Sequence, residues 1–127
     1  MYDELGPGTE QKPIDFNDID VSNLDSFCNN KYQGIFNHTD FKYIDISYWD
    51  VSNIKSMGSM FTYCEELKSV GDISEWDVSN VTDMTHMFNT CKKFNQDISG
   101  WNVSKVRYHS YMFHNCPIKE EYKPKFK

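Results

Sequence analysis

The sequence has no long hydrophobic run, and this absence argues against a membrane-spanning protein. No stretch approaches the ~18 consecutive apolar residues that a transmembrane helix needs. The first six residues are acidic and lack the basic and apolar regions of a secretory signal. We therefore expect a cytoplasmic protein if Met1 is the native start, and a secreted or cell-surface protein if a leader has been removed.

Signatures of catalysis are also missing. The chain has only six glycines and contains no glycine-rich phosphate-binding loop. Its four histidines do not recur with a nucleophile and an acid in a catalytic arrangement. The sequence therefore predicts neither enzymatic activity nor a cofactor.

The whole chain has a net charge of −6, and positive charge is scarce in its first part. Residues 1–50 contain ten acidic and three basic side chains, whereas residues 101–127 contain two acidic and six basic ones. No uniform basic face results, which argues against direct binding of nucleic acid. The opposite charges at the two ends would allow head-to-tail self-association or docking of a charged partner, although solvated charged ends are the simpler interpretation.

What the sequence does contain is a phrase that returns four times, at 14–24, 44–54, 72–81 and 97–106. Its leading aspartates are Asp15, Asp45, Asp72 and Asp97, so the successive periods are 30, 27 and 25 residues. Self-similarity at such periods is typical of solenoids, in which each repeat buries its apolar face only against its neighbours. An aromatic content of 16 % can supply a substantial core.

Each phrase is followed by a stripe at i, i+3, i+4 and i+7, the spacing of one face of an α-helix. The four stripes are Tyr32, Ile35, Phe36 and Thr39; Met57, Met60, Phe61 and Cys64; Met84, Met87, Phe88 and Cys91; and His109, Met112, Phe113 and Cys116. A five-residue insertion after Leu24 displaces the first stripe. Within the phrase, Trp76 and Val78 alternate as in a half-buried strand, and Ile73 before them requires a bend.

These patterns predict an α/β repeat solenoid with four coils, each a short parallel strand and corner followed by a short helix. We expect the coils at 14–39, 44–64, 71–91 and 96–116. Residues 1–13, which contain Gly6, Pro7, Gly8 and Pro13, are interpreted as a flexible leader. Residues 117–127 begin with a helix-stopping proline and are interpreted as a charged cap over the last coil.

The segments Val81–Phe88 and Phe94–Ser104 resemble the BspA-like repeat, a divergent relative of leucine-rich repeats with a period of roughly 25 residues. The resemblance covers residues 14–116. This family is common in bacterial surface proteins and mycoplasma lipoproteins, and it also occurs in protist and large-virus proteins. The resemblance implies a solenoid with parallel strands and, in the surface members, adhesion or protein binding.

The cysteines and the leading aspartates do not have the spacing of a metal site. Cys64, Cys91 and Cys116 share one repeat position without a second ligand close by, so we interpret them as a ladder of small buried hydrophobes. Cys28, in the insertion, is the candidate reactive thiol. One carboxylate per coil does not supply the six to eight oxygens of a calcium site, so we expect the aspartates to cap turns.

Positions that vary between repeats carry the functional hypothesis. They are 17–18, 47–48, 74–75 and 99–100. We predict a non-catalytic protein-binding module whose contact surface contains Asp18, Asp45, Tyr48, Asp50 and Glu75, with Tyr48 as the aromatic anchor. The alternative is a small acidic intracellular inhibitor, from a virus or mobile element, that blocks a host nucleic-acid-binding enzyme. A purely structural spacer is a third interpretation.

Overall fold

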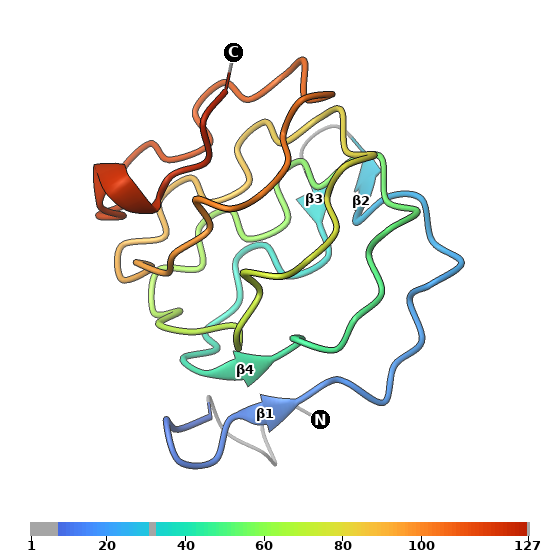
Figure 1. Cartoon of the computed structure of the whole chain (residues 1–127). Coiled ribbons are helices and arrows are strands. Elements are labelled where there is room, and N and C mark those ends of the chain that lie inside the picture. Colours follow the sequence, from blue (N-terminus) through green and yellow to red (C-terminus); the bar gives the residue numbers. More distant parts are fainter. Residues whose placement is uncertain (1–7, 31–32, 127) are drawn as a thin grey trace.

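The computed structural model describes residues 8–30 and 33–126, and regular secondary structure is sparse in them. Strand β1 (Ile14–Asp15) pairs in parallel with β4 (Ile44–Asp45). Strand β2 (Cys28–Asn30) pairs antiparallel with β3 (Gln33–Gly34). A short 3-10 helix, η1, spans Glu120–Tyr122. Figure 1 shows the chain passing through successive layers, from its blue N-terminal part to its red C-terminal part.

The predicted α/β solenoid is wrong, because residues 8–30 and 33–126 contain no α-helix. The three later segments predicted as helices, 57–64, 84–91 and 109–116, each contain two residues with left-handed backbone angles. In the first of them these are Ser59 (φ 58°) and Tyr63 (φ 59°). An α-helix requires φ near −63° at every position. The equivalent left-handed residues are His86 and Thr90 in the next repeat and Tyr111 and Asn115 in the last. No helix in the described ranges is long and apolar enough to cross a membrane.

The backbone amides of these segments alternate between two kinds of partner. Every second amide donates to a carbonyl of the next layer, with N···O distances of 2.8–2.9 Å. These donor–acceptor pairs are Met57 with Asp83, Ser59 with Thr85, Phe61 with Met87, and Tyr63 with Asn89. The intervening amides of Met60, Thr62 and Cys64 donate to carbonyls three residues back in the chain. Residues 84–90 repeat the pattern with residues 108–114. The alternation satisfies these amides without a helix.

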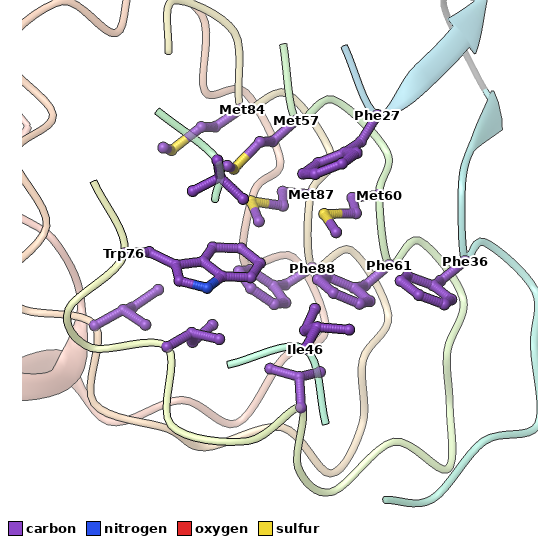
Figure 2. Close-up of a cluster of buried hydrophobic side chains, with 14 of the residues drawn as sticks. Phe27, Phe36, Ile46, Met57, Met60, Phe61, Trp76, Met84, Met87 and Phe88 are labelled. Carbon is purple, nitrogen blue, oxygen red and sulfur yellow. The ribbon is translucent and has the colours of Figure 1, made fainter. Parts of the chain in front are cut away.

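We call the passes at 14–39, 44–64, 71–91 and 96–116 layers 1 to 4, and the segments 57–64, 84–91 and 109–116 turn segments. The side chains of each helical stripe still point to one side, where equivalent residues align across the layers. Figure 2 shows Met84, Met57 and Phe27 in one row and Phe88, Phe61 and Phe36 in another. The rings of Phe36, Phe61 and Phe88 stack at centroid distances of 5.6 and 5.4 Å. Consecutive tight turns therefore have the same apolar spacing as one face of a helix.

Layer 1 departs from the predicted alignment. Phe27 takes the place that Met57 and Met84 have in later layers, and its amide donates to the Ser56 carbonyl (3.0 Å). The extra residues form the β2–β3 hairpin, so the insertion follows Phe27 rather than Leu24. Tyr32 of the predicted first stripe lies outside the described residues, as do residues 1–7 of the predicted leader and Lys127 of the predicted cap.

The repeat phrase forms β-turns rather than strands. The amide of Trp49 donates to the Ile46 carbonyl (3.1 Å), and the amide of Ile54 donates to the Val51 carbonyl (3.0 Å). Equivalent bonds close the first of these turns at 16–19, 73–76 and 98–101, which confirms the predicted bend. The strand predicted at the Trp-Val positions is absent from the described residues, because inter-layer pairing in β1 and β4 ends before them.

Residues 117–126 lie against layer 4. The Tyr122 carbonyl accepts a hydrogen bond from the Ile98 amide (3.0 Å), and the Phe126 ring stacks on His109 with centroids 3.9 Å apart. Ile118 and Pro124 are buried. This segment covers the last layer beside Ile98 and the His109 ring, but it supplies no acceptor to the amides of His109, Tyr111, Phe113 and Asn115.

Candidate partner-binding surface

The surface around Tyr48 is built from turns of layers 1 and 2. Ser47 and Tyr48 are the central residues of the β-turn that begins at Ile46. The Tyr48 amide donates to Asn17 Oδ1 in layer 1 (2.9 Å), and the Asn17 amide donates to Asp15 Oδ1 (2.8 Å). These bonds fix the backbone beneath Tyr48, while the residue itself is 85 % exposed.

Asp45 and Asp50 hold the turns on either side of Tyr48. Asp45 Oδ1 accepts hydrogen bonds from the amide (2.9 Å) and the hydroxyl (2.6 Å) of Ser47. Asp50 Oδ1 accepts the same pair from Ser52, at 3.1 and 2.6 Å. Burial opposes ionisation of Asp45, but the bonds from Ser47 prevail and lower its pKa; at Asp50 the bonds from Ser52 lower the pKa. Both carboxylates therefore stay charged at neutral pH.

Asp18 and Glu75 occupy the turn position of Tyr48 in layers 1 and 3, and both are exposed. Asp18 follows Asn17, whose side chain binds the Tyr48 backbone, so the structure brings Asp18 to the same side of the molecule as Tyr48. Glu75 lies one layer further along the same line of turns. The predicted contact residues thus belong to three neighbouring layers.

The aspartate-capped turn recurs throughout the chain. Amide and hydroxyl bonds to an aspartate two residues earlier come from Ser22, Ser47, Ser52, Ser74, Ser79 and Ser99. The predicted turn-capping role of Asp45, Asp72 and Asp97 is confirmed by these bonds. The carboxylates of Asp20 and Asp77 repel that of Asp50, which shows that acidic groups of successive layers lie near one another. Across the described ranges, no three His, Cys, Asp or Glu side chains are arranged to hold a metal ion.

The repeat cysteines differ in depth. Cys64 and Cys91 are fully buried, and their thiols donate to the Phe36 and Phe61 carbonyls (3.0 Å each). Cys116 is half-buried, more exposed than predicted, because no further layer follows layer 4 in the described chain. Burial raises the pKa of all three thiols. Cys28 begins β2 and is also half-buried.

A second exposed surface was not predicted from the sequence. It consists of ring side chains at the left-handed positions, where His38 stacks on Tyr63 (4.9 Å) and His86 stacks on Tyr111 (5.3 Å). The signal was a histidine or tyrosine between the apolar positions of successive repeats. A helix would place these positions away from the apolar stripe.

The repeat phrase also places the chain in a family. A family model described as "Mycoplasma protein of unknown function, DUF285" matches residues 14–122, which include all four layers. The chain therefore belongs to this mycoplasma-associated family. No curated protein and no solved structure matches it significantly.

Proposed function

We propose that this chain is a non-catalytic protein-binding module and that the turns around Tyr48 form its contact surface. The observation that carries this proposal is a tyrosine that is 85 % exposed on a backbone held by a neighbouring layer. A large aromatic side chain on a fixed backbone contributes contact area with little loss of conformational entropy. Tyrosine is also among the residues that most often dominate binding energy.

The charge around Tyr48 selects the kind of partner. Asp45 and Asp50 flank Tyr48 in the sequence, and Asp18 lies in the neighbouring turn of layer 1. Hydrogen bonds from Ser47 and Ser52 favour the ionised forms of Asp45 and Asp50. A protein with an apolar notch and a basic rim complements such a surface. The likeness of the repeat phrase to BspA-like repeats, whose surface members bind proteins, supports the same function.

A second candidate function follows from the acidic groups of layers 1 to 3. Asp20, Asp50 and Asp77 hold equivalent places, and mutual repulsion acts on Asp50. The side-chain amides of Asn53 and Asn80 bind the Ser22 and Ser52 carbonyls of the preceding layers (2.9 and 2.7 Å), so the three fixed charges follow one another at short intervals. Such a row suits an acidic inhibitor that occupies the nucleic-acid groove of an enzyme.

Capture from a native host extract with the immobilised chain tests the first function. A genuine partner is retained by the wild type and by Tyr108→Ala, which removes another tyrosine, 61 % exposed, from layer 4. It is lost with Tyr48→Ala and weakened, in a salt-dependent manner, by Asp18→Lys and Glu75→Lys. If a folded Tyr48→Ala variant retained the partner as well as the wild type does, the contact surface would have to lie elsewhere.

The same experiment separates the two functions. An inhibitor that mimics nucleic acid loses its partner when Asp20, Asp50 and Asp77 are changed to asparagine, and duplex DNA competes with it for that partner. A module anchored on Tyr48 is insensitive to DNA and more sensitive to Tyr48→Ala than to the three neutral changes.

A further inference from the structure

Alternate backbone amides of the last turn segment have no hydrogen-bond partner among the described residues. In layers 2 and 3 the alternate amides bond to the carbonyls of the following layer. The corresponding amides of His109, Tyr111, Phe113 and Asn115 meet no acceptor in residues 8–30 and 33–126. A row of free donors at the edge of a hydrogen-bonded stack is a template for another chain.

The first layer carries the matching acceptors. In layer 2, the carbonyls of Ser56, Met60 and Thr62 accept bonds from layer 1. Their counterparts in layer 1 are the carbonyls of Ser26, Ile35 and Asn37, and no donor in the described part of the chain reaches them. Layer 1 is therefore left with acceptors where layer 4 is left with donors.

An apolar side chain and a hollow accompany these groups. Ile35 is 48 % exposed, although its counterparts Met60, Met87 and Met112 are buried. A hollow of about 370 Å³ lies beside the last turn segment, with Met112, Phe113, Pro124 and Phe126 among its walls. In the register of the stack, a residue equivalent to Ile35 in a following layer would lie over Met112.

Charge follows the same register. One line of residues crosses the four layers through backbone hydrogen bonds. The Lys55 amide donates to the Asp25 carbonyl, and the Thr82 amide donates to the Lys55 carbonyl. The Arg107 amide in turn donates to the Thr82 carbonyl. The line begins with an exposed acid in layer 1 and ends with an exposed base in layer 4. A following layer that began with Asp25 would bring opposite charges together.

We propose that the chain associates head to tail through its turn segments, with residues 109–116 of one copy docked on residues 26–27 and 34–38 of a second copy, beside the segment 117–126. The amides of His109, Phe113 and Asn115 then donate to the carbonyls of Ser26, Ile35 and Asn37. Ile35 enters the hollow over Met112, and Asp25 faces Arg107. In layer 1 the β2–β3 hairpin replaces the residue whose carbonyl would accept a bond from the Tyr111 amide, so the Tyr111 amide gains no bond in the complex. Because the contact joins unlike surfaces, it does not close after two copies.

Sedimentation velocity of the full chain over a range of concentrations tests the proposal. The average mass of the wild type should rise with concentration at low salt and less so at high salt. Asp25→Arg and Arg107→Asp should each weaken association about tenfold or more, because each places like charges at the junction. An equimolar mixture of these two variants should associate again, since every junction between unlike copies then pairs opposite charges.

Two further variants complete the test. Glu65→Arg reverses an exposed charge in the middle of the stack, where Glu65 pairs with Lys92 (2.8 Å), and should leave self-association unchanged. Ile35→Asp should abolish the association while the thermal unfolding temperature stays near that of the wild type, because Ile35 is half-exposed in the single chain. A monomer at every concentration in low salt would overturn the proposal, as would a monomeric mixture of the charge-swapped variants. Association that survives Ile35→Asp would place the contact elsewhere and overturn it too.

Discussion

At the scale of single residues, position in the stack sets the chemistry of a side chain. Cys64 and Cys91 hold the same repeat position as Cys116, but the first two are fully buried and the third is half-buried. The inner thiols donate to carbonyls of the preceding layer at 3.0 Å, whereas the Cys116 thiol donates to the Phe94 carbonyl, which follows layer 3, at 3.6 Å. Identical residues therefore differ in access to solvent and in hydrogen bonding.

Thiol labelling should follow this order of depth. In the native protein we expect Cys28 to react first, Cys116 second, and Cys64 and Cys91 only after unfolding. The thiolate is the reactive species, and burial raises the pKa of Cys64, Cys91 and Cys116. Mass spectrometry of peptides after timed labelling measures the order. Labelling of Cys91 at the rate of Cys28 without denaturant would contradict the buried ladder.

At the scale of elements, the sequence predicted positions better than conformations. The periods and the inward-facing residues follow from apolar spacing, because equivalent side chains must meet in a shared core. The helix did not follow, because consecutive tight turns place i, i+3, i+4 and i+7 on one side as a helix does. The distinguishing feature is φ > 0 at Ser59 and Tyr63, and neither residue is a glycine that would have signalled it.

The candidate surfaces divide in the same way. The turn that carries Tyr48 was foreseeable, because aspartate followed two residues later by serine is a local turn signal that acts within a few residues. The amides of 109–115 that lack partners in the described chain were not foreseeable, because their hydrogen bonding depends on which segment follows and on how the backbone alternates. That information lies in contacts between residues 24–27 positions apart, as in Phe61 with Met87 and Met84 with Tyr108.

Substitution of Ser59 distinguishes turn from helix. Ser59→Gly should be more stable than Ser59→Ala by about 1 kcal/mol, because alanine is strained at φ 58° and glycine is not. A helix would give the opposite order by a similar amount. Urea unfolding measures both variants. Gly58→Ala is the matched control: its φ is not left-handed and its Cβ would meet neighbours at 3.5 Å or more, so it should be tolerated.

Acid should destabilise the aspartate-capped turns. Hydrogen bonds from serine lower the pKa of Asp72 and Asp77 below the usual 3.8. A carboxyl whose folded pKa is lowered stabilises the fold above its unfolded pKa, and this contribution is lost as pH falls through the folded pKa. We expect the free energy of unfolding to fall below about pH 4.

Asparagine at both positions tests this origin of the acid sensitivity. Asn102, the counterpart of Asp77 in layer 4, already accepts a bond from the Ser104 amide (3.1 Å), so asparagine can keep the amide bond of such a turn without a titrating group. The variant that combines Asp72→Asn and Asp77→Asn should lose less stability between pH 5 and pH 3 than the wild type, in urea titrations at each pH. An unchanged pH dependence would assign the acid sensitivity to other groups.

At the scale of the whole molecule, layers contact mainly their neighbours, so the cost of a cavity depends on the layer. Phe88 is fully buried, and Phe61 and Phe113 stack on it at 5.4 and 5.9 Å. Phe113 is only partly buried, with Lys123 over its ring at 5.4 Å. Phe88→Ala should cost about 3–5 kcal/mol, and Phe113→Ala clearly less. Equal losses in denaturant titrations would contradict stacking in chain order.

The central claim is that each turn segment donates alternate amides to the next layer, so that those of the last turn segment have no partner in the described part of the chain. Residue-resolved hydrogen exchange of the dilute protein tests it most directly. The amides of Met84, His86, Phe88 and Thr90 donate to layer 4 at 2.7–3.0 Å and should exchange slowly. Those of His109, Tyr111, Phe113 and Asn115 should exchange orders of magnitude faster. Continuous protection through 109–116, or equal protection of the two sets in the monomer, would contradict the account.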